Sequence, residues 1–150
     1  MRVTTATSLL LTFVVASASA QAPSQLKWGP APPVFPAGAQ MAVVKGDPGK
    51  AAEFTVQLKF PDGYAIAPHW HPTDEHLKVV SGTFKVGMGK KVEAAKMMTL
   101  KVGDSATAPA KEPHYAKTQG ATVVQVHAMG PFALTYVNPA DMPKAAVAKK

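Results

Sequence analysis

The most regular hydrophobic pattern in the chain is the alternation of polar and apolar residues in EFTVQLKF, residues 53–60. A period of two residues predicts a strand with one buried face and one exposed face. Pro61-Asp62-Gly63 follows and predicts a turn. Further short β-type runs recur about every 8–12 residues, which is typical of an all-β sandwich or barrel. These runs are HLKVV, TFKVGMG, MTLKV, SATAPA, TVVQVHAM and FALTYV.

Turn residues separate these runs and set the expected ends of the strands. Ser81-Gly82, Gly103-Asp104, Gln119-Gly120 and Gly130-Pro131 are each expected to turn the chain between two strands. Only KKVEAAKMM, residues 90–98, has the pattern of a short helix. The pattern as a whole predicts one all-β barrel or sandwich, because a chain of 150 residues suits a single domain.

Residues 1–20, MRVTTATSLLLTFVVASASA, have the layout of a secretory signal peptide. Arg2 precedes an apolar run, and Ala18-Ser19-Ala20 supplies small residues at a cleavage site. We predict cleavage after Ala20 and export to the periplasm or out of the cell. The apolar run is shorter than the roughly 20 residues of a membrane-spanning helix, so no stable membrane anchor is expected. A weakly held N-terminal anchor is the alternative.

Residues 21–41 are predicted to form an extended, proline-rich arm. Five prolines in this segment exclude a helix or a central strand. Apolar residues such as Val34 and Phe35 are expected to lie along the surface of the barrel. The β-domain is predicted to span residues 42–138, followed by a loosely held tail over residues 139–150.

Charge and cysteine content narrow the possible functions. The formal net charge is +7, and it becomes +6 without Arg2, the one arginine of the chain. Arginine is the usual residue for gripping phosphates, and the lysines are scattered, so nucleic acid is not an expected partner. The chain has no cysteine, so the domain depends on its core and any metal must be bound by nitrogen and oxygen.

Three of the five histidines lie together in HWHPTDEH, residues 69–76. Strand alternation places His69 and His71 on one face, where two imidazoles can bind a single metal ion. Glu75 follows a turn and can supply an oxygen ligand, although its direction does not follow from counting residues across a turn. On these residues alone, a polar surface segment is as compatible as a metal site.

A longer frame surrounds these residues. It reads Gly-x5-His-x-His-x3-Glu-x6-Gly, and its fixed positions are Gly63, His69, His71, Glu75 and Gly82. This frame is similar to the first sequence signature of the cupin family, and it is matched at every fixed position.

A second segment, GDSATAPAKEPHYAKT, resembles the second cupin signature, Gly-x5-Pro-x-Gly-x2-His-x3-Asn. Gly103, Pro109 and His114 stand at the expected spacing. Lys111 replaces the second glycine of the signature and Thr118 replaces its asparagine, and neither change removes a ligand. Lys111 puts the turn before His114 in question, because glycine there relieves backbone strain.

The resemblance covers about residues 54–129 and implies a double-stranded β-helix, or jelly-roll, barrel. It further implies that His69, His71, Glu75 and His114 bind one divalent metal ion inside one mouth of the barrel. The chain looks like a small, single-domain exported cupin and is similar to the ChrR-like cupins.

The function implied by the resemblance is that of a metal-dependent oxidoreductase of the dioxygenase type, acting on a small organic molecule. The metal is one of Fe, Mn, Ni, Cu or Zn, because the ligand set alone does not select among them. Glu75 is also the candidate catalytic base. The alternative is a non-catalytic module of the cell envelope that binds a metal or a small ligand. Pairing of edge strands makes a homodimer compatible with this architecture.

Two histidines are expected to lie outside the metal site. His76 follows Glu75 directly and should face away from it in a regular strand. His127, in VVQVHAM, is interpreted as a polar residue on a strand face. Met97 and Met98 could bind copper, but without a periodic methionine cluster they are better interpreted as packing residues.

Overall fold

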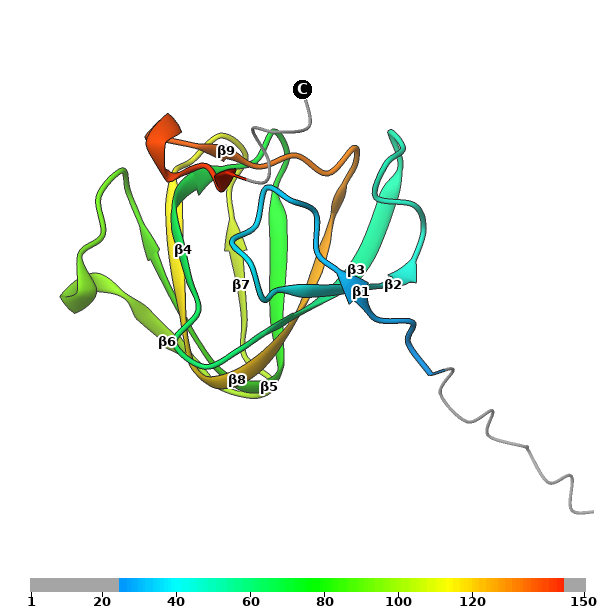
Figure 1. The fold of residues 1–150 in the computed structure, drawn as a ribbon, viewed down its shortest axis with the longest axis horizontal. Coiled ribbons are helices and arrows are strands. Elements are labelled where there is room, and N and C mark those ends of the chain that lie inside the picture. Colours follow the sequence, from blue (N-terminus) through cyan, green and yellow to red (C-terminus); the bar gives the residue numbers. More distant parts are fainter. Residues whose placement is uncertain (1–24, 145–150) are drawn as a thin grey trace, which may run out of the picture.

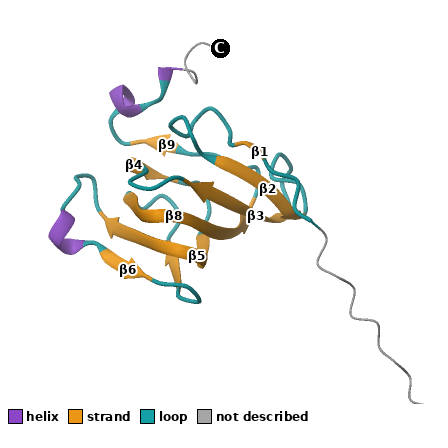
Figure 2. Cartoon of the chain, turned by 60° about the horizontal axis from the view of Figure 1, so that its bottom comes forward, coloured by secondary structure: helices purple, strands orange, loops and turns teal. Residues whose placement is uncertain are grey.

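The computed structural model describes residues 25–144, which form a curled, antiparallel β-structure (Figure 1). Within this range the helical segments are two 3₁₀ turns, η1 (Ala94–Lys96) and η2 (Pro139–Asp141), drawn in purple in Figure 2. Neither is long enough to cross a membrane. The predicted all-β fold class is confirmed. The strands are β1 (Gly29–Pro30), β2 (Gln40–Lys45), β3 (Glu53–Phe60), β4 (Ala65–Trp70), β5 (Glu75–Met88), β6 (Met98–Leu100), β7 (Ser105–Ala108), β8 (His114–Met129) and β9 (Thr135–Tyr136).

The predicted helix over residues 90–98 is wrong. Only η1 is helical there, and the side chain of Glu93, which precedes it, makes no capping hydrogen bond. None of the residues of η1 is buried, so no packing compensates for the short length. A helix needs either about 12–15 residues or tertiary packing to be stable, and this segment has neither.

Strand β8 is the centre of the sheet. The strands are ordered β1-β2-β3-β8-β4-β9, and β5 adds contacts with β6, β7 and β8. The first part of β8 pairs with β4, and its second part pairs with β3. Strand β5 runs along the whole of β8, from the pair Glu75–Ala128 to the pair Met88–His114. The β5–β8 pair therefore belongs to both walls of the barrel.

The turns predicted at Ser81-Gly82 and Gln119-Gly120 are bends inside two long strands. The β5–β8 register shifts around residues 79–83, and Gly82 and Gly120 both have left-handed φ angles, of 78° and 76°. Thr122 is fully buried at the bend, and its hydroxyl accepts a hydrogen bond from the Thr83 amide at 3.2 Å. Glycine favours these positions because it adopts a positive φ without steric cost.

The bend folds the two halves of the β5–β8 pair into walls that face each other across an apolar core. The predicted alternation in β3 is confirmed, because every second residue of this strand points into the core. The residues of that face are between 0% and 4% exposed, and they are Phe54, Val56, Leu58 and Phe60.

The proline-rich arm packs on the barrel as predicted. Phe35 is buried, and the Tyr136 hydroxyl donates a hydrogen bond to the carbonyl oxygen of Val34 at 2.8 Å. The Tyr64 hydroxyl donates in the same way to Pro36. Burial raises the pKa of Tyr136 to about 12, so this hydroxyl keeps its proton at neutral pH.

The predicted domain boundaries stay predictions. The arm ends in regular structure, since β2 begins at Gln40, and η2 lies at the start of the predicted tail. The predicted signal peptide, with its cleavage after Ala20, lies outside the described residues.

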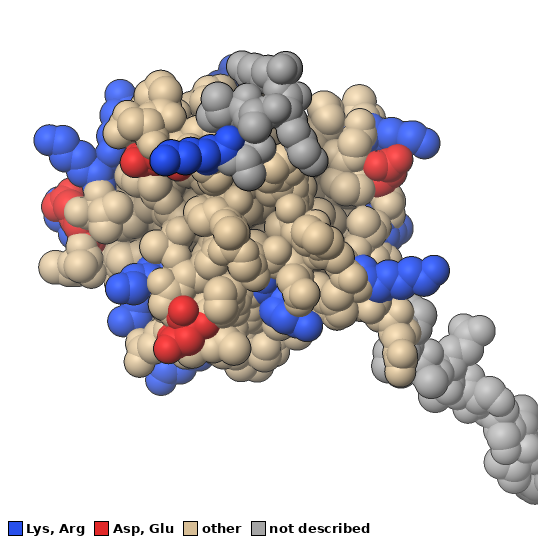
Figure 3. All heavy atoms as spheres, viewed as in Figure 1, with Lys and Arg blue, Asp and Glu red and all other residues tan. Residues whose placement is uncertain are grey.

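Lysines are spread over the surface without a continuous basic stripe on the face shown in Figure 3. They lie mostly around the edge of this face, next to a few acidic groups, and its centre is largely uncharged. Two exposed pairs, Lys50–Asp47 and Lys96–Glu93, are ion pairs between residues three positions apart. Such pairs contribute little to stability.

We expect Gly82→Ala to lower the free energy of unfolding by about 2–3 kcal/mol, because it adds a steric clash to an unfavourable φ angle. A Cβ atom at this position would lie 2.4 Å from the Ala121 carbonyl oxygen. Gly120→Ala is the matched control, since it has a similar φ and an added Cβ would meet nothing within 4 Å. Urea unfolding should show a clearly smaller loss for Gly120→Ala. Equal losses would mean that the clash at the bend is not the controlling factor.

Candidate metal centre

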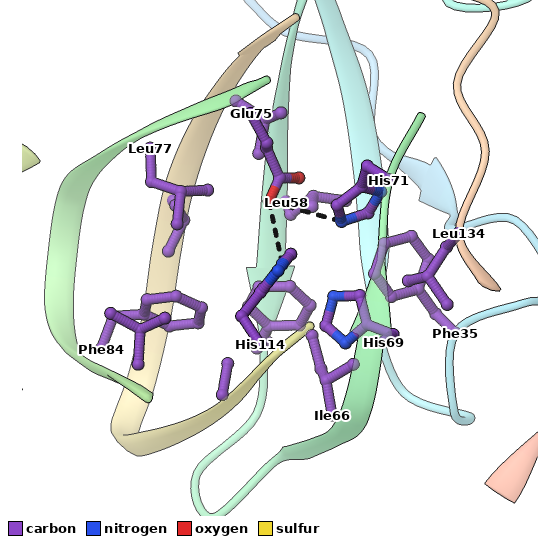
Figure 4. Close-up of a pocket in the computed structure, with 15 residues that line it drawn as sticks. Phe35, Leu58, Ile66, His69, His71, Glu75, Leu77, Phe84, His114 and Leu134 are labelled. Atoms are coloured by element: carbon purple, nitrogen blue, oxygen red, sulfur yellow. Dashed lines mark ion pairs between the residues drawn. The ribbon is translucent and has the colours of Figure 1, made fainter. Parts of the chain in front are cut away.

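The predicted ligand residues converge inside one end of the barrel (Figure 4). His69 lies near the end of β4, His71 follows that strand, and Glu75 and His114 are the first residues of β5 and β8. All four are buried, with exposed fractions between 2% and 7%. One nitrogen from each of the three imidazoles lies within 4.8 Å of the others. The side chain of Glu75, whose direction the sequence left open, also points toward this cluster.

Strand pairing explains how residues far apart in the sequence meet here. His69 and His114 are direct partners in the β4–β8 pairing, and their ring centroids are 4.3 Å apart. Glu75 lies opposite Ala128, near the other end of β8. Because the β5–β8 pair is bent at Gly82, this other end returns to the same mouth of the barrel.

Hydrogen bonds to the backbone fix the orientation of each imidazole. Nδ1 of His69 lies 2.8 Å from the Ala67 carbonyl oxygen, and Nδ1 of His71 lies 2.7 Å from that of Ala133. Nδ1 of His114 lies 3.0 Å from the carbonyl oxygen of Glu112. A carbonyl only accepts hydrogen bonds, so each Nδ1 carries the proton and each Nε2 presents a lone pair.

The Nε2 atoms of His71 and His114 are buried and have no hydrogen-bond partner. A buried polar atom without a partner costs free energy and needs an explanation. A metal ion at the centre of the cluster would pair both atoms, and the protonated Nδ1 atoms have the backbone partners typical of metal-binding histidines.

Glu75 completes the donor set. Its Oε2 lies 3.5 Å from Nε2 of His71 and 3.7 Å from Nε2 of His114. These distances place the three donor atoms around a common centre, as Figure 4 shows with dashed lines. Three neutral imidazoles and one carboxylate suit a divalent transition ion, so the residues present fit the metal that the resemblance implies.

The surroundings of His69 and Glu75 favour the protonation states in which these two residues bind a metal. Burial, together with the neighbouring His114 and His71, lowers the pKa of His69 to about 3, so this ring is neutral at neutral pH. Burial on its own would raise the pKa of Glu75, but His71 and His114 outweigh it and hold the pKa below the ordinary value. The centre therefore combines a neutral imidazole with an ionised carboxylate.

The donor atoms open into a small apolar cavity of about 20 Å³. About 10–15 Å³ is enough for one water molecule, so the cavity has room for little more than one or two small groups. Apart from the four donor residues its lining is apolar, and it includes Phe84 and Leu77 of β5. Phe35 of the proline-rich arm also lines it, which the sequence pattern did not indicate.

Both departures from the second cupin signature are accommodated. Lys111 keeps a left-handed conformation, with φ of 63°, and its amide donates a hydrogen bond to the His71 carbonyl oxygen at 2.8 Å. The Thr118 hydroxyl accepts a hydrogen bond from the Tyr64 amide and donates one to the carbonyl oxygen of Pro61. Lys111 thus retains the turn at some cost in strain, and Thr118 holds the turn before β4.

His76 and His127 lie outside the centre, as predicted. His76 is exposed on the opposite face of β5 from Glu75, and His127 pairs with it from β8. Met97 and Met98 are not among the residues that line the cavity, and their interpretation as packing residues is wrong for Met98, which is 55% exposed.

The comparisons with known proteins agree with this geometry. The family described as "Cupin domain" matches residues 56–130, which make up half of the chain. The chain therefore belongs to the cupin superfamily, and the predicted jelly-roll architecture is confirmed. No curated protein matches the sequence significantly. The closer resemblance to ChrR-like cupins stays a prediction.

Solved structures show the same fold at low sequence identity. The polyketide cyclase RemF from Streptomyces resistomycificus matches with a TM-score of 0.65 and 14% identity, over 85% of this chain and 94% of that one. A candidate acetylacetone dioxygenase from Methylibium petroleiphilum matches with a TM-score of 0.61 and 21% identity, over 89% and 90%. KdgF from Halomonas sp. matches with a TM-score of 0.52 and 23% identity, over 69% and 86%. At these identities the likeness establishes the fold and not the activity.

We expect the metal-free protein to lose stability as the pH falls below about 6.5. In that range the unfolded chain binds a proton at His69 that the folded chain, with its pKa of about 3, does not bind. The loss should amount to about 2 kcal/mol between pH 6.5 and pH 5. Chemical unfolding of chelator-treated protein at several pH values measures it. A His69→Gln variant should show a flatter dependence, and an unchanged slope in that variant would contradict the assignment.

Proposed function

We propose that this cupin binds one divalent transition ion through His69, His71, Glu75 and His114, and that it is an oxidoreductase of the dioxygenase type acting on a small organic molecule. The observation that carries the proposal is the set of buried Nε2 lone pairs, two of them without partners, that face a carboxylate. When bound, the ion would supply Lewis-acid or dioxygen chemistry. Four protein ligands leave one or two positions of a five- or six-coordinate ion for other groups.

The cavity favours an uncharged substrate. The groups that line it are apolar, apart from the three imidazoles and Glu75, and no lysine is among them. A dianionic substrate would need positive charge that this lining does not supply. Small neutral molecules with an enolisable carbonyl, such as β-diketones, combine an apolar body with two oxygens that the centre can orient.

Glu75 is the group that can move a proton. It is buried, ionised and within 4 Å of two imidazoles whose Nδ1 protons are held by backbone carbonyls. With an ion bound, the Nε2 lone pairs of those imidazoles would be engaged as ligands and would not be free to accept a proton. Glu75 is therefore the candidate base for removing a proton from a bound enol or carbonyl compound.

A specific observation favours the second candidate, a non-catalytic metal- or small-ligand-binding module of the cell envelope. The cavity of about 20 Å³ is far smaller than the roughly 300–1,000 Å³ of typical ligand pockets. A substrate larger than a few atoms requires its lining to move. In this alternative the centre serves only to hold the ion.

Export to the periplasm or out of the cell belongs to the same proposal. Its support is the layout of residues 1–20. The expected partner is a small-molecule substrate or ligand, and neither nucleic acid nor a stable membrane anchor is part of the proposal. A homodimer stays compatible with it.

We expect purified, untagged protein to retain roughly one transition ion per chain after dialysis against a weak competing chelator. His71→Ala and His114→Ala should each lose most of this ion, because each removes one of the inward-facing nitrogens. Elemental analysis measures the content. His76→Gln is the control and should retain the ion, since that ring lies on the outer face. Full occupancy in His71→Ala or His114→Ala would show that the ligand assignment is wrong.

Oxygen consumption separates the two candidate functions. The protein loaded in turn with Fe(II), Mn(II), Ni(II), Cu(II) or Zn(II) is mixed with acetylacetone, with a flavonol and with other enolic compounds. Uptake above that of the His114→Ala variant supports the oxidoreductase. No uptake with any metal form and any compound, in protein that holds its ion, supports the binding module.

Phe35→Ala should widen the range of ligands that the centre accepts. Phe35 lines the cavity and stacks on Phe132, with ring centroids 5.8 Å apart, so its removal opens the cavity toward the arm. We expect the preference for benzoylacetone over acetylacetone, measured as a ratio of binding constants by calorimetry, to rise at least about 10-fold. The cost in stability should be about 3 kcal/mol.

Phe54→Ala is the matched control for this prediction. Phe54 is also buried and packs edge-on against Phe132, but it does not line the apolar cavity that Phe35 lines; it lines a separate, smaller cavity next to His71 and Glu75. Phe54→Ala should therefore be destabilised to a similar extent without the change in ligand preference. A parallel change in both variants would mean that general loosening, and not the position of Phe35, sets the preference.

A further inference from the structure

A row of four polar side chains crosses the outer face of the barrel, directly behind the metal centre. Thr55 of β3 pairs with His127 of β8, His127 pairs with His76 of β5, and His76 pairs with Thr107 of β7. Neighbouring residues of a strand point to opposite faces, so His76 faces outward where Glu75 faces the cavity. The row is thus separate from the inner donor set, although both use strands β5 and β8.

The two imidazoles of this row face each other. Their ring centroids are 6.2 Å apart and their planes are inclined by 23°. The ring centroids of His71 and His114 inside the barrel are closer, at 5.2 Å. His76 is exposed, so the ring pair is open to solvent.

A threonine hydroxyl holds each ring on the side away from the other. Nδ1 of His76 lies 3.0 Å from Oγ1 of Thr107, and Nδ1 of His127 lies 3.2 Å from Oγ1 of Thr55. A hydroxyl can accept a hydrogen bond from a protonated Nδ1, which leaves Nε2 with its lone pair. In this tautomer the row resembles the arrangement at the inner centre, with a threonine hydroxyl in place of each backbone carbonyl.

The surface beside the pair is hollowed and carries negative charge. A hollow of about 430 Å³ is lined by both histidines and by Glu53 and Asp74. One oxygen of Asp74 already accepts a hydrogen bond from the Ala110 amide, at 2.7 Å. Both imidazoles therefore border a hollow whose rim also carries carboxylates, and imidazole nitrogen suits Cu(II) or another late divalent transition ion.

We propose that His76 and His127 form a second, solvent-exposed site for a divalent transition ion, with Cu(II) bound most tightly. The two Nε2 atoms are the ligands, and Glu53 and Asp74 balance the charge of the ion. Thr55 and Thr107 are positioning residues that act through the rings. The site is weaker than the inner centre, because it has two imidazoles instead of three and is open to water.

Titration of the untagged, full-length exported protein with Cu(II) alone tests the site. The inner centre is first filled, and Cu(II) is then added without a competing chelator, while calorimetry and electron paramagnetic resonance report each bound ion. Wild-type protein should bind an additional ion with nitrogen ligands. His127→Gln and His76→Gln should each weaken this additional binding by at least about 10-fold. Removal of the hydrogen-bond partner of a ligand already lowers metal affinity by about 10-fold, and removal of the ligand itself should lower it at least as much.

Three further variants make the test specific. Gln125→Ala changes the same face of β8 two residues away and should bind the additional ion as wild type does. Thr107→Val should weaken binding by about 10-fold without removing a ligand. His114→Gln should lose the inner ion and keep the outer one, which separates failure of this site from failure of the proposed function. The proposal is overturned if His76→Gln and His127→Gln bind as many Cu(II) ions as wild type, with unchanged affinity and spectra.

Discussion

The bend in the β5–β8 pair is the constraint on which the rest of the structure depends. A straight antiparallel pair would hold Glu75 and His114 at opposite ends, since Glu75 pairs with Ala128 and His114 pairs with Met88. The register shifts around Gly82, and Thr122 fills the inside of the bend, so the two ends return to one mouth of the barrel. The position of the candidate metal centre is thus a consequence of backbone geometry at the bend, and not at the donor residues themselves.

Polar groups inside an apolar barrel need compensation, and here the backbone supplies most of it. Each inner histidine donates a hydrogen bond from its Nδ1 to a backbone carbonyl oxygen, and this bond offsets the desolvation of that nitrogen. The Nε2 atoms and the carboxylate are left to compensate one another or an ion. Metal affinity and the stability of the barrel are therefore coupled, because an ion that binds the folded chain through these atoms also stabilises it.

The sequence predicted the donor set better than it predicted the strands. The spacings of the two cupin signatures that the chain resembles pick out His69, His71, Glu75 and His114, because a bulge or a bend changes the path of the chain but not the count of residues. Strand ends were predicted from glycines, and Gly82 and Gly120 turned out to bend long strands and not to end them. Phe35 could not be placed in the cavity, because a proline-rich segment has no periodicity that shows which side chain faces inward.

The inner cluster and the outer row use adjacent residues of the same two strands, β5 and β8. Glu75 and His76 are neighbours, and so are His127 and Ala128, so the same two pairs of residues build the wall between the cavity and the outer row. The alternation that buries Glu75 necessarily exposes His76. An ion on either face would rigidify the same β5–β8 segment. If both faces bind an ion, each has its own carboxylates, Glu75 inside and Glu53 and Asp74 outside, so neither site shares a carboxylate with the other.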